Sequence, residues 1–85
     1  MEVFHPEFYR MVRGARVLLG WTQSELARKA EISLSTLNRL ERGEGFPSVK
    51  SLGRLNQIFL EAGVRFVVHS PTEYGVMVKM SERKK

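Results

Sequence analysis

The segment from residue 21 to residue 43, WTQSELARKAEISLSTLNRLERG, carries two helix start signals close together. Thr22 and Glu25 form a T-x-x-E capping box at the first start. Ser33 is a cap residue at the second start, and Gly43 is a stop signal. The spacing predicts two short helices joined by a tight turn of about three residues.

Each short helix has one apolar face. In the first, Leu26, Ala27 and Ala30 are expected to face inward, and in the second Leu37 and Leu40 share one side, since a helix turns by about 100° per residue. The opposite side of the second helix carries small polar and basic side chains, with a leucine at its edge: Leu34, Ser35, Asn38, Arg39 and Arg42. Arg pairs with guanine and Asn with adenine in the major groove, so this face suits base reading.

The flanking segments complete a small bundle. A helix is predicted from about Pro6 to Gly20, and another from Ser48 to about Ala62 with Gly63 as its stop. After Gly63 the apolar period becomes two, which predicts strands over 64–68 and 76–80 with 70–75 as their connection. The fold class is therefore mainly α, a small bundle of four predicted helices with a C-terminal β-hairpin.

Composition narrows the functional classes. The 85 residues suffice for one small domain, and the net charge of +5 favours polyanionic partners. Without cysteine, disulfides and thiolate metal sites are excluded. His5 and His69 are far apart in sequence, and no glycine-rich phosphate loop is present. We therefore expect no enzyme, no cofactor and no metal.

No apolar run approaches a membrane span, and the N-terminus does not have the pattern of a signal peptide. We therefore expect a protein of the cytoplasm, associated with the nucleoid and not with a membrane.

The stretch WTQSELARKA followed by ISLSTLNRLERG is similar to the helix-turn-helix family of phage repressors and Cro proteins, also called the xenobiotic-response-element (XRE) family. The resemblance covers roughly Val12 to Gly63. The resemblance rests on three short motifs. They are Thr-Gln at the start of the first short helix, Glu-Leu-Ala inside it, and Leu-Glu-Arg-Gly at the end of the second. It implies a compact lambda-repressor-like bundle of four or five helices that binds double-stranded operator DNA as a dimer.

The resemblance also implies roles for single residues. Gln23 matches a glutamine that contacts a phosphate and braces the reading helix, and Arg16 and Glu41 match a structural ion pair. Arg42 and the loop after it match a region that approaches the DNA backbone. The base-reading positions are Leu34, Ser35 and Arg39, with Asn38 beside them.

Further phosphate contacts are expected from the basic residues alone, because Lys and Arg neutralise phosphates without reading sequence. The candidates are Lys50, Arg13, Arg28, Arg42 and Arg54.

Two residues depart from the family pattern. Glu31 occupies the turn position that usually carries glycine, which costs roughly 1–2 kcal/mol if the residue is left-handed, unless the turn relaxes. Leu34 replaces a polar residue that is frequent at the start of the reading face. Leucine cannot hydrogen-bond a base but can pack on a thymine methyl group. The family's operator sequences therefore do not transfer to this chain.

A lone hairpin is marginal in water, so it needs the helices or another chain to cover it. We predict that it joins two copies. The expected division is a DNA-binding domain at 1–63, a dimerisation hairpin at 64–80 and a basic tail at 81–85. A two-fold dimer would place two reading helices about 34 Å apart, which predicts an approximately palindromic operator. The predicted function is a sequence-specific transcription regulator, a repressor acting as a homodimer.

Two alternatives remain open from the sequence. The chain could be an antitoxin that autoregulates its operon and binds a toxin protein, because a hairpin edge can accept a partner strand. It could also be an adaptor that keeps the bundle for protein contacts alone. The basic charge and the polar face of the second short helix argue against the adaptor.

Overall fold

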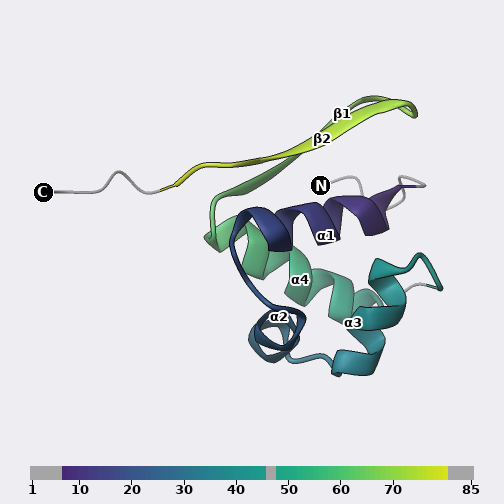
Figure 1. Ribbon diagram of the computed structural model, residues 1–85, viewed down its shortest axis with the longest axis vertical. Helices are drawn as coiled ribbons and strands as arrows, with labels where there is room; N and C mark the ends of the chain where they lie inside the picture. The colour runs from purple at the N-terminus through teal and green to yellow at the C-terminus, as the bar shows by residue number, and fades with distance from the viewer. Residues whose placement is uncertain (1–6, 46–47, 81–85) are drawn as a thin grey trace, which may run out of the picture.

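The computed structural model describes residues 7–45 and 48–80. Within them lie the helices α1 (Phe8–Leu18), α2 (Gln23–Ala30), α3 (Leu34–Glu41) and α4 (Val49–Glu61), followed by the strands β1 (Val64–Ser70) and β2 (Glu73–Val78). The hairpin lies on one side of α1, and α2 and α3 lie on the other (Figure 1). The predicted helical bundle with a C-terminal hairpin is confirmed. The predicted helix start at Pro6 and the tail at 81–85 lie outside the described residues.

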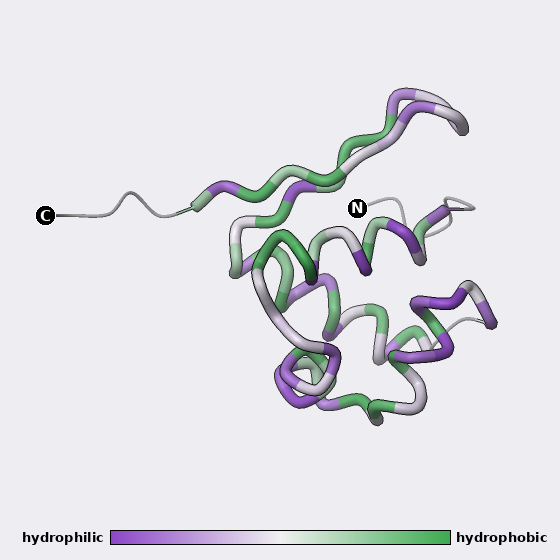
Figure 2. The backbone as a smooth tube through the Cα atoms, viewed as in Figure 1, coloured by the Kyte–Doolittle hydropathy of each residue, from purple (hydrophilic) through white to green (hydrophobic). Residues whose placement is uncertain are grey.

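The core is built from the predicted apolar faces. Its buried side chains come from all four helices and the first strand: Phe8, Val12, Ala15, Leu26, Ala27, Ala30, Leu37, Leu40, Leu55, Phe59 and Val64. Figure 2 shows the strands as largely hydrophobic and the end of α3 with its following loop as hydrophilic. Hydrophobic burial thus supplies the main stabilising term, and residues 42–45, which follow α3, stay exposed.

An aromatic chain links the helices to the hairpin. The Phe59 ring stacks on Trp21 with centroids 6.4 Å apart and meets Phe66 of β1 edge-on at 5.8 Å. Phe66 in turn lies 6.3 Å from Phe8. Trp21 therefore packs within the protein, as its position before the cap of α2 predicts.

Both predicted start signals cap their helices. The Thr22 hydroxyl accepts the Glu25 backbone N–H at 3.0 Å, and the Glu25 carboxylate accepts the Thr22 N–H at 2.7 Å. At α3 the Ser33 hydroxyl accepts the Thr36 N–H at 3.0 Å. Each start is thus fixed by its own side chains, independently of the core.

The turn between α2 and α3 contains a residue in the left-handed backbone conformation. Glu31 has φ 57° and ψ 44°, and the Ile32 N–H reaches back to the Ala27 carbonyl at 3.0 Å. Arg54 of α4 donates to the Glu31 carbonyl oxygen at 3.0 Å. The turn therefore does not relax. Arg54, a predicted phosphate contact, is bonded to the backbone of this turn.

The hairpin differs from its predicted bounds. β1 runs through Ser70 and β2 begins at Glu73, so the expected connection at 70–75 is wrong, as is a second strand that extends to Met80. The Ser70 hydroxyl accepts the Thr72 N–H at 3.2 Å, which closes the connection early. Tyr74, which was predicted in the connection, then pairs with Val68 in the ladder.

One face of the hairpin covers the helices. Val64 is buried, and Phe66, Val76 and Val78 pack against the core. Val68, two residues further along β1 from Phe66, remains 36% exposed. The apolar face of the sheet is therefore only partly covered.

Gly63 joins α4 to the hairpin at a point where only glycine fits. Its φ is +89°, and a Cβ there would collide with the Lys79 carbonyl oxygen. The Lys79 N–H donates to the Gly63 carbonyl at 2.8 Å. The base of the hairpin is thus held against the end of the bundle.

The left-handed turn predicts that glycine is more stable than alanine at position 31, which is the reverse of their order within a helix. Glu31→Gly should be more stable than Glu31→Ala by about 1 kcal/mol in urea unfolding, because only alanine is strained at positive φ. The same pair at Asn56, exposed within right-handed α4, should show the opposite order. Equal stabilities at position 31 would contradict a left-handed turn.

The capping box predicts a pH effect. The Thr22 backbone N–H holds the pKa of the Glu25 carboxyl below its ordinary value of 4.5. The resulting stability is complete above that ordinary value and is lost as pH falls through the lowered pKa. The melting temperature of Glu25→Gln should therefore fall less between pH 7 and pH 3 than that of the unchanged chain. Parallel melting curves would argue against the cap.

Candidate nucleic-acid interface

The outer face of α3 presents the predicted base-reading residues to solvent. Ser35 and Arg39 are exposed, Asn38 is half-buried, and Leu34 is 43% exposed. Positions separated by three or four residues lie together on a helix, so these side chains form one surface. We call Leu34, Ser35, Asn38 and Arg39 the reading face.

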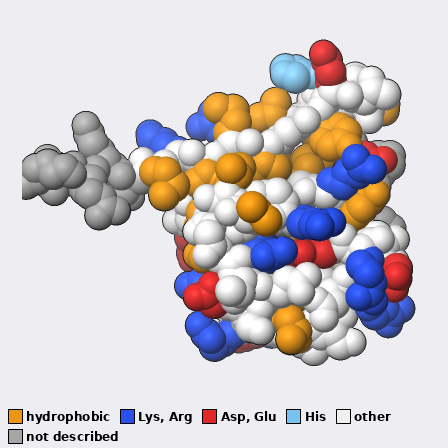
Figure 3. Space-filling view, in the orientation of Figure 1, with side chains coloured by type: hydrophobic (Ala, Val, Ile, Leu, Met, Phe, Trp, Pro, Cys, Tyr) orange, Lys and Arg blue, Asp and Glu red, His pale blue; other side chains and the backbone are white. Residues whose placement is uncertain are grey.

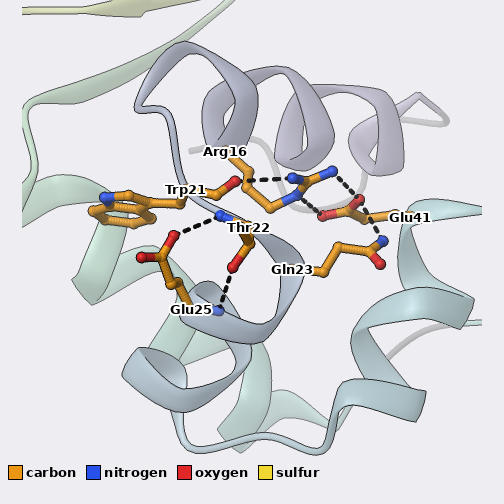
Figure 4. Close-up of polar contacts among 6 residues, drawn as sticks. All are labelled: Arg16, Trp21, Thr22, Gln23, Glu25 and Glu41. Carbon is orange, nitrogen blue, oxygen red and sulfur yellow. Dashed lines mark hydrogen bonds and ion pairs between the residues drawn. The ribbon is translucent and has the colours of Figure 1, made fainter.

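A buried carboxylate fixes the end of α3. Glu41 is 3% exposed, and its two oxygens accept from Arg16 of α1 at 2.8 Å (from Nε) and 3.0 Å (from Nη2). Arg16 Nη1 also donates to the Trp21 carbonyl at 2.9 Å. Figure 4 shows these bonds meeting between α1, the start of α2 and α3. We call Arg16, Gln23 and Glu41 the clamp.

Gln23 completes the clamp from the first position of α2. Its Nε2 donates to Glu41 Oε1 at 3.0 Å, as Figure 4 shows. The side chain therefore has the bracing geometry that the resemblance implied. Its contact with a phosphate stays a prediction, and the start of α2, where backbone N–H groups point outward, is a favourable place for one.

Arg42 stands at the end of α3 beside an acidic neighbour. Its Nε lies 3.0 Å from Glu44 Oε2, and the Arg42 guanidinium holds the pKa of the Glu44 carboxyl below its ordinary value. Both side chains are well exposed, so water screens the pair. A phosphate approaching Arg42 would compete with Glu44.

A hollow that the sequence did not reveal adjoins the reading face. It has a volume of about 320 Å³ and lies between α3 and the start of α4; the described residues that line it are Thr36, Arg39, Leu40, Glu44, Gly45, Ser48 and Ser51. Ser48 caps α4 by accepting the Ser51 N–H at 3.1 Å. Lys50 is exposed in the same first turn. The cap signal was visible in sequence, but its proximity to Arg39 depends on the fold.

Tyr9 also contributes to this region, although the sequence did not single it out. Its ring lies 3.4 Å from where a Cβ on Gly43 would stand, and Gly43 has φ +77°. The start of α1 therefore supports the loop that follows α3.

The remaining candidate cations differ in their surroundings. Arg13 and Arg28 are exposed, whereas Arg54 is bonded to the turn at Glu31. In the space-filling view, Lys and Arg lie mostly over the helical part, and hydrophobic side chains gather along the hairpin side (Figure 3). The helical part thus carries most of the positive charge on that face.

Among residues 7–45 and 48–80, no group of three or more metal-ligating side chains comes together. The helices in those ranges are too short or too polar to cross a membrane.

Comparison with known protein families places the chain beside one of them. A family model described as "Helix-turn-helix" matches residues 12–59, which run from α1 to α4 and include the clamp and the reading face. A search of curated proteins finds no significant match.

The clamp predicts a large loss of stability on truncation. Glu41→Ala should lower the free energy of unfolding by about 3–5 kcal/mol, because it leaves a largely buried guanidinium unpaired. Arg39→Ala, on the same helix but exposed, should change it by less than about 0.5 kcal/mol. Urea unfolding measures both. Similar values for the two variants would refute the structural role of Glu41.

Proposed function

We infer that this chain, which belongs to the phage repressor and Cro-like (XRE) helix-turn-helix family of DNA-binding transcription regulators, is a repressor. We propose that it binds an approximately palindromic operator as a homodimer, in the cytoplasm and associated with the nucleoid. The observation that carries the proposal is the reading face of α3, exposed to solvent while the clamp fixes the helix behind it.

Sequence discrimination would come from the reading face. The guanidinium of Arg39 can pair with guanine and the amide of Asn38 with adenine, each contributing roughly 1–3 kcal/mol. Ser35 can donate to or accept from a base edge, and Leu34 can pack on a thymine methyl group. These are the roles we propose for the four side chains.

Affinity would come from phosphate contacts around that face. The start of α2 at Gln23 and the start of α4 at Lys50 offer backbone N–H groups where a helix end favours negative charge. Arg42 lies at the C-terminal end of α3, next to the loop that follows it. Such contacts fix the register on the duplex and carry no base information.

The homodimer would place two reading faces on one duplex. The hairpin lies on the side of α1 away from α3 (Figure 1), so a contact made there leaves α3 free. Two-fold symmetry then gives half-sites about 34 Å apart or a multiple of that distance.

The antitoxin alternative rests on the same hairpin, because the edge of a hairpin can receive a strand from a toxin protein. A small toxin reading frame beside the gene, and co-purification of its product with this chain, would favour it.

Selection of bound duplexes from a random pool, repeated at two salt concentrations, tests the proposal. We expect a two-fold symmetric site and affinity that falls with salt. Asymmetric sites would overturn the dimeric operator, and the absence of any preferred sequence would overturn specific regulation.

Single substitutions separate the two kinds of contact. Arg39→Ala and Asn38→Ala should each relax preference at one base pair by roughly 1–3 kcal/mol, whereas Lys50→Ala should weaken all sequences alike and reduce the salt slope by about 1. Binding of each variant to the selected site and to its single-base variants measures this. Unchanged preference after both α3 substitutions would remove them from the reading face.

A further inference from the structure

We propose that two copies of the chain join through the outer faces of their hairpins, which stack in antiparallel directions so that the tip of each hairpin covers the base of the other. This deepens the homodimer proposed above and rests on it. The proposal specifies the surface, the relative direction of the two copies and the side chains that meet.

The hairpin has one face toward the helices and one face away from them. Phe66, Val76 and Val78 pack against the core, and successive side chains of a strand point to opposite faces. The described helices all lie on the side of the hairpin where these three residues pack (Figure 1). We call the other side the outer face; its residues are Arg65, Val67, Glu73, Gly75, Met77 and Lys79.

The outer face carries opposite charges at its two ends. Lys79 lies at the base of the hairpin, bonded through its N–H to Gly63, and Arg65 follows two residues after Gly63. Glu73 lies at the tip, opposite Ser70. The three charged side chains are exposed, and within the part of the chain that the structure describes none of them takes part in an ion pair.

The same order of side chains is visible on the molecular surface. Along the hairpin side of Figure 3, Lys and Arg side chains are followed by hydrophobic ones, and these by a histidine and an acidic side chain. A surface that is basic at one end and acidic at the other is complementary to a second copy of itself turned through 180°. This complementarity identifies the partner as another copy of the chain.

The middle of the outer face combines a projecting side chain with a hollow. Met77 is 59% exposed. A hollow of about 420 Å³ adjoins it, with Val67 and Gly75 among the residues that line it, and a Cβ added to Gly75 would meet nothing within 4 Å. Methionine is unbranched and fills irregular gaps well. Met77 of one copy is therefore suited to the hollow of another.

Charge selects the direction in which the two hairpins stack. Stacked sheets lie roughly 10 Å apart, with their facing side chains in contact. In the parallel direction, Glu73 would face Glu73 and Lys79 would face Lys79. In the antiparallel direction, residues equally distant from Val76 along β2 face each other. Glu73 then faces Lys79 of the second copy, and Met77 faces Gly75.

This contact is compatible with DNA binding by both copies. The outer face points away from α1, and α3 lies on the far side of α1 from the hairpin (Figure 1). Stacking therefore places the two helical bundles on the outer sides of the paired hairpins. The reading face of each copy stays uncovered.

Charge exchange tests the antiparallel direction. Glu73→Lys and Lys79→Glu should each weaken dimerisation by about tenfold in sedimentation equilibrium at low salt, because each dimer contains the pair twice and both become like-charge pairs. An equimolar mixture of the two variants should dimerise as tightly as the unchanged chain, since the heterodimer restores both pairs. Within one chain, Glu73 begins β2 and Lys79 follows its last residue, so no contact inside a copy explains the rescue.

A lysine in the middle of the face tests the surface itself. Val67→Lys should weaken dimerisation by at least tenfold, because it places a charge in the stacked contact. Val49→Lys is the matched control, since Val49 is 86% exposed at the start of α4, and Glu61→Lys is the control for Glu73→Lys. Neither control should change the dissociation constant. Circular dichroism melting curves check that each variant is folded.

The outcomes separate this proposal from the homodimer itself. A dimer that keeps its dissociation constant in Val67→Lys would overturn the outer face as the contact and leave a homodimer joined elsewhere. Weakening by both charge variants without rescue in the mixture would overturn the antiparallel direction. A chain that stays monomeric would overturn both the stacking and the homodimer.

Discussion

The carboxylate of Glu41 is the constraint on which the rest of the molecule depends. A buried charge is tolerated only when it is paired and hydrogen-bonded, and Glu41 meets that condition through Arg16 and Gln23. These partners come from α1 and α2, so its bonds fix α3 to two other helices at once. Hydrophobic burial is non-directional; it turns Leu37 and Leu40 inward but does not set the final rotation of the helix. The planar fork of Arg16 has a defined direction, and it thereby helps to orient the reading face.

Several guanidinium groups near α3 have partners within the protein, which limits how much of the positive charge is free to bind DNA. Arg16 is held in the clamp, Arg54 is bonded to the left-handed turn, and Arg42 lies against Glu44. In each case a guanidinium stabilises backbone or side-chain geometry near α3. Three of the 14 Lys and Arg residues therefore already have partners within the fold near α3.

The features that were predictable from sequence are those that short-range chemistry fixes. The capping box at Thr22, the cap at Ser33 and the inward faces of the helices depend on residues within two turns of each other. The predicted hairpin bounds were wrong because strand pairing depends on a partner that is distant in sequence. Gly75 is a typical turn residue, but it pairs with Val67 within the ladder. The partnership of Arg16 with Glu41 joins residues far apart in sequence, and only the family resemblance indicated it. The hollow beside Arg39 depends on where α4 begins in space, which no local pattern encodes.

α1 lies between the clamp and the hairpin and contacts both. Arg16 on one side of it enters the clamp, and a Cβ on Gly14 would stand 3.8 Å from Val76 of β2 on the other. The Lys79 N–H bonds to the Gly63 carbonyl, so the base of the hairpin is held against the end of α4. If two copies join through the hairpin, the distance between their reading faces is set by the helices that pack against it and not by a linker. Half-site spacing is then a fixed property of the fold, because a rigid dimer accepts only operators whose half-sites match its own geometry.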